Sequence, residues 1–137
     1  MTYLLDTPVV SEPARPNPSE SVLNWLTVHA ADSALSVITV GELQKGISQM
    51  PAGTRRTRFD AWISNAVLRG FQILPVDTRV ALVWGRLLGE AAAEGSPLPN
   101  LDSLIAATAL VHDLTVVTRN VRHFERCGVV VKNPWGD

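Results

Sequence analysis

Residues 1–12 read MTYLLDTPVVSE, and the predicted architecture follows from this segment. Its apolar run, Tyr3–Leu5, ends abruptly at Asp6, which a threonine and a proline follow. Such a run is typical of a strand that is buried on both faces of a parallel sheet. Asp6 is then expected at the carboxyl end of that strand, where open α/β sheets bind their ligands. The alternative is that Asp6 only caps a turn, because Asp before Thr-Pro is common turn chemistry.

Short apolar runs alternate with amphipathic stretches along the rest of the chain. Three prolines between residues 13 and 18 exclude a regular helix before Ser19. Further strands are expected over residues 34–38, 71–76, 115–118 and 129–132. Helices are expected over residues 19–31, 39–52, 54–70, 78–95, 103–112 and 121–126. The alternation predicts one α/β domain over residues 1–137, a three-layer α/β/α fold with a central parallel sheet of four to five strands.

Composition limits the function classes. The chain has 137 residues, 46% hydrophobic and 18% charged, which is typical of a compact folded protein. Its net charge of -1 argues against binding nucleic acid by charge alone, and the one dense basic run, GTRRTRFD at 53–60, is expected to be a solvated helix face. Cys127 is the only cysteine, and no signal peptide or transmembrane stretch is expected, so a reducing cytoplasm is the predicted location.

Three acids are expected at the same edge of the sheet. Asp6 ends the first strand, Glu42 stands three residues after the possible helix cap Thr39, and Asp102 precedes the apolar helix SLIAATALVH. Capping explains Glu42 and Asp102 separately, but it does not explain why all three acids reach one edge. Three carboxylates in one crevice would repel one another by several kcal/mol, so they require protons or a cation. Mg²⁺ or Mn²⁺ is favoured, since few nitrogen or sulfur ligands are available.

Five segments, in this order and at these separations, carry a family resemblance. They are YLLDTPVVSE, VGELQKGI, PLPNLDSLIAATAL, VVTRNVRHFE and GVVVKNPW. Together they resemble the PIN-domain ribonucleases of the VapC toxin type, especially the FitB-like branch. The resemblance implies a Mg²⁺- or Mn²⁺-dependent endoribonuclease, the toxin of a type II toxin–antitoxin module. It also implies a homodimer, inhibition by a cognate VapB-type antitoxin, and contact with operator DNA only through that antitoxin.

The resemblance assigns site residues in this chain. The first three acids of the family fall on Asp6, Glu42 and Asp102, which are expected to hold the metal while a metal-activated water attacks the RNA phosphate. The fourth acidic position is occupied by His123, so weaker binding of a second ion is expected. Pro8 stands where asparagine is common, which reduces the expected polar support beside Asp6.

Other polar residues are expected to support the site. Thr7 and Thr118 offer hydroxyl groups, Asn120 offers an amide, and Arg119 is expected to contact either a phosphate or a surface acid. The antitoxin is expected to use apolar residues of the helices between residues 19 and 50. Two alternatives stay open: a catalytically weakened PIN module that mainly binds the antitoxin and operator complex, and a nuclease directed at DNA.

Overall fold

A parallel sheet of five strands forms the centre of the domain. The computed structural model describes residues 1–136. The strands are β1 (Tyr3–Leu5), β2 (Ser33–Ser36), β3 (Gln72–Leu74), β4 (Thr115–Val117) and β5 (Val131–Lys132). Their order across the sheet is β3-β2-β1-β4-β5, and every neighbouring pair is parallel. The predicted parallel sheet is confirmed, and β1 lies at its middle.

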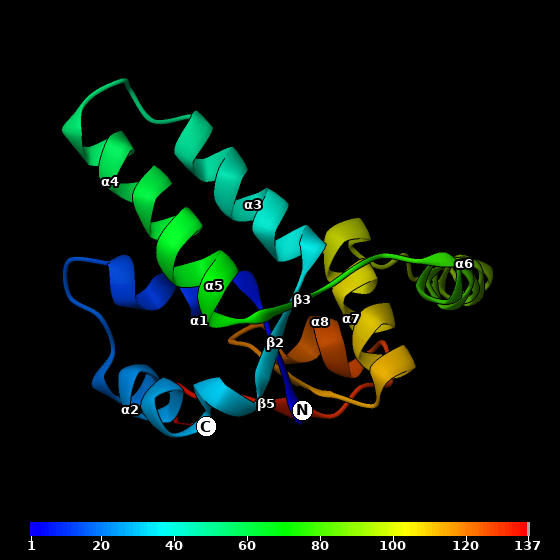
Figure 1. The fold of residues 1–137 in the computed structure, drawn as a ribbon. Helices are drawn as coiled ribbons and strands as arrows, with labels where there is room; N and C mark the ends of the chain where they lie inside the picture. Colours follow the sequence, from blue (N-terminus) through cyan, green and yellow to red (C-terminus); the bar gives the residue numbers. More distant parts are fainter. Residues whose placement is uncertain (137) are drawn as a thin grey trace.

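Helices cover both faces of this sheet (Figure 1). The α-helices are α1 (Thr7–Ser11), α2 (Glu20–His29), α3 (Val37–Ser48), α4 (Thr54–Trp62), α5 (Leu68–Gly70), α6 (Thr78–Ala93), α7 (Asn100–His112) and α8 (Val121–Glu125). Short 3-10 turns follow α1 and α2, and a π-helical turn, Ile63–Val67, joins α4 to α5. None of the helices within residues 1–136 has the length and apolar character needed to cross a bilayer.

The middle strand shows why the fold has three layers. Leu4 and Leu5 are both fully buried, but they point to opposite faces because side chains alternate along a strand. Leu4 belongs to a core with Ile105 of α7 and Phe124 of α8. Leu5 belongs to a second core with residues of α2, α3 and the π-helical turn, including Val22. One apolar run therefore supports two cores, and the predicted α/β/α architecture is confirmed.

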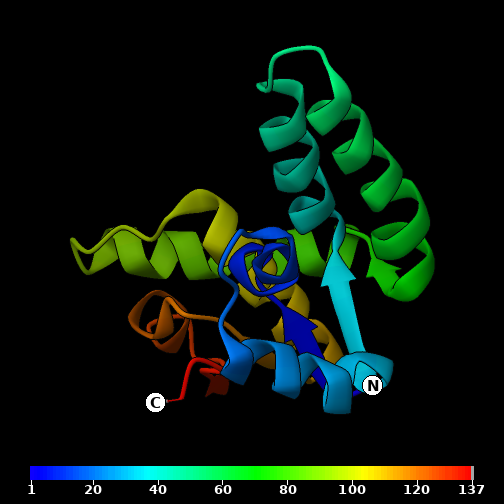
Figure 2. The ribbon, with the colours of Figure 1, turned by 90° about the vertical axis from the view of Figure 1, so that its left-hand side faces the viewer.

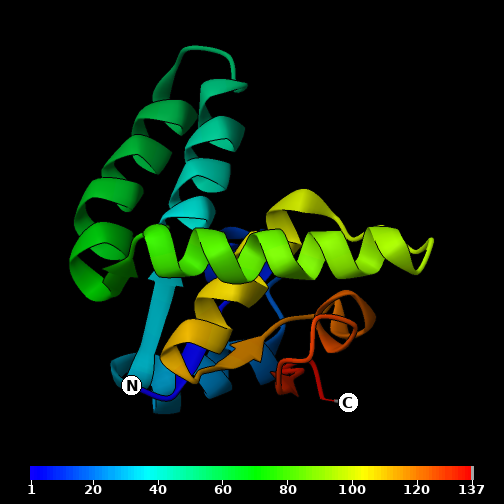
Figure 3. The same cartoon turned by 90° about the vertical axis from the view of Figure 1, so that its right-hand side faces the viewer.

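Two helices extend past the carboxyl ends of the strands. Strand β2 runs directly into α3, and α3 and the α4–α5 helix rise side by side beyond the sheet (Figure 2). Gly53, at φ 152°, stands between them in a conformation that favours glycine. On another side of the domain, α6 crosses over α7 (Figure 3). The carboxyl edge of the sheet is thus flanked by α1, by the base of α3 and by the first turn of α7.

The prediction that no regular helix precedes Ser19 is wrong. Helix α1 begins directly after β1, and Asp6 is its N-cap. Pro8 lies in the first turn of this helix, where a proline is tolerated because the early N–H groups have no partner within the helix. The prolines end α1 instead of preventing it, since a 3-10 turn, Glu12–Ala14, follows at once.

The predicted start of α3 is also wrong. The cap is Ser36, whose hydroxyl accepts a hydrogen bond from the Ile38 N–H at 3.0 Å, so the helix begins at Val37 instead of near Thr39. Thr39 is a buried residue inside the helix. Glu42 consequently lies in the second turn and is not part of a capping box.

Candidate functional site

A pocket of about 300 Å³ at the carboxyl edge of the sheet contains all three predicted acids. We call it the acid pocket. Its lining residues are Asp6, Thr7, Pro8, Ser11, Glu42, Asp102 and Asn120. The three carboxylates come from the end of β1, the second turn of α3 and the first turn of α7. Segments that are far apart in sequence therefore place their negative side chains in one small space.

Asp6 is the most constrained of the three acids. It is 2% exposed, and its Oδ1 accepts a hydrogen bond from the Thr7 N–H at 2.9 Å. Its Oδ2 accepts one from the Thr118 hydroxyl at 2.7 Å, and that hydroxyl in turn accepts one from the Asn120 N–H at 2.9 Å. Burial raises the pKa of Asp6 to about 6, against the lowering effect of both hydrogen bonds, and the charges of Asp102 and Glu42 raise it further. Asp6 therefore both caps α1 and presents a desolvated carboxylate to the pocket.

Glu42 is positioned by a residue of α1. The Thr7 hydroxyl donates a hydrogen bond to Glu42 Oε1 at 2.6 Å, and the same hydroxyl lies 3.4 Å from Thr39 Oγ1. These contacts join α1 to α3 next to Asp6. Thr7 therefore orients Glu42 next to Asp6, from a helix that was not predicted.

Asp102 is held from the other side of the pocket. It is the third residue of α7, whose N-cap is Pro99, and no side chain caps this helix. Asp102 Oδ2 instead lies 3.0 Å from Nδ1 of His123. The side chains of Asp102 and His123 are 21% and 50% exposed. Asp102 is therefore not the cap of α7, and its side chain lines the acid pocket and contacts His123.

The segment after β4 forms a second pocket beside the first. It has a volume of about 290 Å³, and we call it the basic pocket. Its lining residues are Arg119, Asn120, Val121, Arg122 and His123. The Arg119 guanidinium lies over the ring of Trp135, 4.5 Å from its centre, and forms no ion pair within residues 1–136. The alternative of a surface ion pair for Arg119 is therefore not supported.

The sequence missed three residues near the site. Ser11 lines the acid pocket one helical turn after Thr7, and this i, i+4 spacing would have indicated it if α1 had been predicted. Arg122 follows Arg119 in the basic stretch VTRNVRHFER and offered a composition signal only. Trp135 meets Arg119 across the fold, and no local pattern indicates that contact.

The donor set of the acid pocket fits a hard divalent ion. Its charged groups are all carboxylates, and Asp6 is buried among like charges with no basic partner among residues 1–136. In the same part of the chain, no three carboxylate, imidazole or thiol groups are close enough to ligate one ion together. Mg²⁺ commonly keeps several waters and uses only one or two carboxylates. The arrangement therefore suits a partly hydrated ion better than a closed protein cage.

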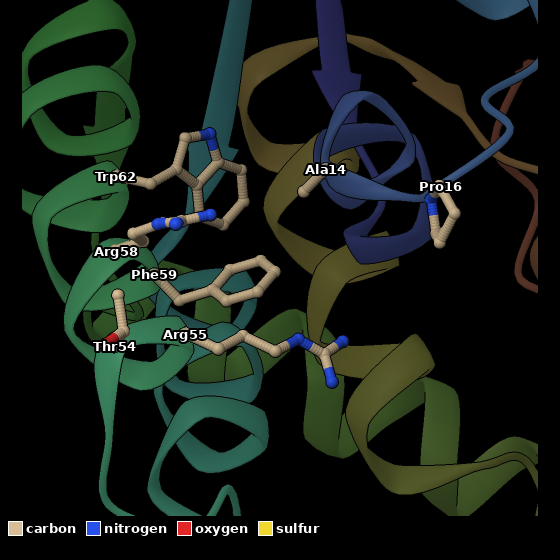
Figure 4. Close-up of a pocket in the computed structure, with 7 residues that line it drawn as sticks. All are labelled: Ala14, Pro16, Thr54, Arg55, Arg58, Phe59 and Trp62. Carbon is tan, nitrogen blue, oxygen red and sulfur yellow. The ribbon is translucent and has the colours of Figure 1, made fainter.

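A larger groove of about 750 Å³ lies between α4 and the segment that follows α1 (Figure 4). Its lining residues are Ala14, Pro16, Thr54, Arg55, Arg58, Phe59 and Trp62, and we call it the α4 groove. Arg55 and Arg58 thus belong to a groove and not only to a solvated face. None of its lining residues comes from the stretch 19–50, where a partner surface was predicted. In that stretch Val22 and Leu43 are used in the core, whereas Val28 and Val37 are exposed.

Comparisons with known proteins cover nearly the whole chain. A sequence model of the family described as PIN domain matches residues 3–129. Toxin FitB of Neisseria gonorrhoeae is 39% identical over 137 residues, spanning 98% of this chain and 99% of the relative. VapC ribonuclease Y4jK of Sinorhizobium fredii is 37% identical over 96% of both chains. The crystal structure of FitAcB from Neisseria gonorrhoeae has a TM-score of 0.93 at 38% identity, and the match covers 99% of this chain and 100% of that one. A structure of FitAB bound to an IR36 DNA fragment has a TM-score of 0.92 at 37% identity, over 99% and 97% of the two chains.

Proposed function

Because this chain belongs to the PIN-domain family and is similar to FitB and VapC toxins, we propose that it is a ribonuclease, the toxin of a type II toxin–antitoxin module. One observation carries the proposal: carboxylates from three separate segments line one pocket of about 300 Å³. Purely structural acids would not need to converge, since their mutual repulsion is unfavourable. The reaction is hydrolysis of an RNA phosphodiester, which fits the cytoplasmic location predicted from the sequence.

Asp6, Asp102 and Glu42 are the residues that would hold Mg²⁺ or Mn²⁺, directly or through water. When bound, the ion would supply Lewis-acid stabilisation to the phosphate and increase the acidity of water. Thr118 and the Thr7 N–H fix the Asp6 carboxylate, so its orientation is set before substrate arrives. The Thr7 hydroxyl does the same for Glu42.

His123 changes the charge of the site relative to the family pattern. It removes one negative charge, and its contact occupies one of the two carboxylate oxygens of Asp102. We therefore propose that the site holds one ion firmly and a second ion weakly. Asn120 lies at the border of both pockets, where its amide can orient water or contact a phosphate.

The test is cleavage of a structured RNA by the purified chain with Mn²⁺ or Mg²⁺, next to Asp6→Asn and Asp102→Asn controls. Cleavage by the unmodified chain that both variants lose supports the proposal. Absence of cleavage, together with retained antitoxin binding, would instead support the weakened binding module, which Pro8 and His123 favour. Single-stranded and duplex DNA in parallel reactions test the DNA-directed alternative.

We propose a VapB-type antitoxin as the partner, with operator DNA reached only through it, and a homodimer as the assembly. The related FitAcB and FitAB structures support a complex of this kind. The α4 groove is suited to bind a partner segment, because Phe59 and Trp62 provide apolar surface while Arg55 and Arg58 provide positive charge (Figure 4). An extended segment with apolar and acidic side chains fits this chemistry.

Co-expression with the neighbouring reading frame tests the partner. Copurification and relief of toxicity are expected, and Arg58→Glu is expected to weaken the complex while Arg79→Glu, on α6, leaves it unchanged. A chain that forms no complex and whose toxicity the neighbour does not relieve would contradict this part of the proposal.

A further inference from the structure

The basic pocket lies directly against the acid pocket. Asn120 lines both of them, and the contact between His123 Nδ1 and Asp102 Oδ2, at 3.0 Å, links their walls. We propose that the basic pocket binds a phosphate of the RNA strand that neighbours the phosphate in the acid pocket. The inference rests on the proposed function, and it adds a substrate subsite built from Arg119 and Arg122.

Two arginines make this pocket suitable for a phosphate. Both are exposed, and within the described part of the chain neither forms an ion pair. A guanidinium is charged at every working pH, and its planar fork matches phosphate oxygens. Arg126, three residues beyond His123, behaves differently, because its guanidinium donates to the Ser96 carbonyl at 2.8 Å and the Ser96 hydroxyl at 2.7 Å. Arg126 fixes a loop, whereas Arg119 and Arg122 face the pocket.

Arg119 is held in place by a contact across the fold. Its guanidinium lies 4.5 Å from the centre of the Trp135 ring, a cation–π contact. The turn that carries Trp135 is itself anchored, since the Ser21 hydroxyl of α2 donates to the Pro134 carbonyl at 2.6 Å and the Trp135 N–H donates to Asn133 Oδ1 at 2.9 Å. An arginine that is already ordered loses less side-chain entropy when it binds a phosphate. Trp135 is therefore a positioning residue for Arg119.

The neighbouring charges favour a nucleic acid strand as the occupant, and under the proposed function that strand is RNA. A nucleic acid strand carries a phosphate on every nucleotide, so a cleaving site needs positive charge beside the position where a cation would neutralise the scissile phosphate. The chain as a whole has a net charge of -1, so this positive charge has to be local. The basic pocket provides this positive charge directly beside the acid pocket, where the cation would bind.

The experiment measures binding of a fluorescent RNA hexanucleotide by anisotropy, in an Asp6→Asn background that prevents cleavage. Arg122→Ala is expected to weaken binding about tenfold. It is also expected to lower the slope of log affinity against log salt by about 0.7, the value for one lost contact with a single strand. The matched control is Arg69→Ala, on α5 at the opposite edge of the sheet, with a change below twofold. A hexanucleotide series with one neutral methylphosphonate at each position should contain a linkage that no longer responds to Arg122→Ala.

The positioning role has its own readout. Trp135→Ala is expected to weaken RNA binding several-fold, and Trp135→Phe, which keeps an aromatic face under Arg119, is expected to restore it. Thermal unfolding of both variants shows whether either one has lost structure. Equal losses of RNA binding in Trp135→Ala and Trp135→Phe would indicate a packing role and contradict positioning.

The outcomes separate this inference from the proposed function. If the unmodified chain cleaves RNA and the Arg122→Ala and Trp135→Ala variants bind RNA like Arg69→Ala, the subsite is overturned alone. If the chain cleaves no RNA but binding falls in these variants and the methylphosphonate series responds, the subsite stands and the nuclease proposal falls. If the variants weaken only a complex with the antitoxin, the pocket is a protein interface and the inference is overturned.

Discussion

Asp6 and Asp102 reach the same pocket from opposite structural situations. Asp6 is 2% exposed, caps α1 and accepts hydrogen bonds from Thr7 and Thr118. The Asp102 side chain is 21% exposed and is not the cap of α7, and within residues 1–136 its one side-chain hydrogen bond is with His123. The fold therefore fixes the orientation of Asp6 by burial and hydrogen bonds, whereas Asp102 is more exposed and its orientation depends on His123. We call Asp6 the fixed acid and Asp102 the adjustable acid.

The largest expected effect is on catalysis. Asp6→Asn is expected to lower the rate of RNA cleavage by about 10³-fold, because it removes a preorganised charge that the site cannot replace. Asp102→Asn is expected to lower it by about 10²-fold, since a more mobile and solvated carboxylate contributes less. Single-turnover cleavage with Mn²⁺ measures both rates. Equal losses, or a larger loss for Asp102→Asn, would contradict the division between a fixed and an adjustable acid.

The second effect concerns stability of the metal-free protein as pH changes. The folded-state pKa of Asp6 is raised to about 6 from 3.8, so between these values the folded chain keeps a proton that the unfolded chain has lost. The contribution of this group to stability is therefore fully present below pH 4 and is lost as pH rises through 6, by up to about 3 kcal/mol. Asp32, whose pKa is lowered mainly by a hydrogen bond from Thr2, acts in the opposite direction. The difference between the chain and Asp6→Asn isolates Asp6.

Urea unfolding with a chelator, at pH 4 and pH 7.5, measures this difference. Asp6→Asn is expected to be more stable than the unmodified chain at pH 7.5 and equal to it or less stable at pH 4. A variant that is less stable at both pH values would show that the hydrogen bonds of Asp6 outweigh its desolvation.

A smaller effect is expected at the threonine that supports Asp6. Thr118→Val keeps the side-chain shape but leaves Asp6 Oδ2 and the Asn120 N–H without the partners they have in the structure. The expected loss is about 1–2 kcal/mol of unfolding free energy at pH 7.5. Thr118→Ser keeps the hydroxyl and is expected to lose less than half of that. Thr27→Val, at an exposed threonine of α2, is the control with an effect below about 0.5 kcal/mol.

Burial and topology explain which parts of the structure could be predicted from the sequence. Tyr3–Leu5 is a nearly unbroken apolar run, and burial on both faces leaves such a run few alternatives to a central strand, so β1 and the position of Asp6 after it were correct. The parallel sheet followed because each strand is separated from the next by a helical stretch. Convergence of the acids then depended only on topology, which is why Asp6, Glu42 and Asp102 were found together.

Local competition between similar signals explains the errors. Ser36 and Thr39 are both good helix caps, and the choice between them depended on where β2 pairs with β1 and β3, which the local sequence does not reveal. Asp6, Thr7 and Pro8 are compatible with the start of a helix as well as with a turn. The prolines between residues 13 and 18 argued against any helix before Ser19, so the short helix α1 was missed. Arg119 precedes β5 in the sequence and Trp135 follows it, and only the folded chain brings the two side chains into contact.

The smallest effect on stability is expected at His123, which contacts the adjustable acid, Asp102. His123→Asp should change the unfolding free energy by less than about 1 kcal/mol, because the His123 side chain is half exposed and an exposed pair contributes little. It should nevertheless raise the affinity for Mn²⁺ several-fold in a calorimetric titration, since it restores a negative charge beside Asp102 and releases that carboxylate from the imidazole. His112→Asp, at the distant end of α7, is the control that adds the same charge away from the pocket. If both variants changed Mn²⁺ affinity equally, overall charge would explain the effect, and the contact between His123 and Asp102 would not control metal binding.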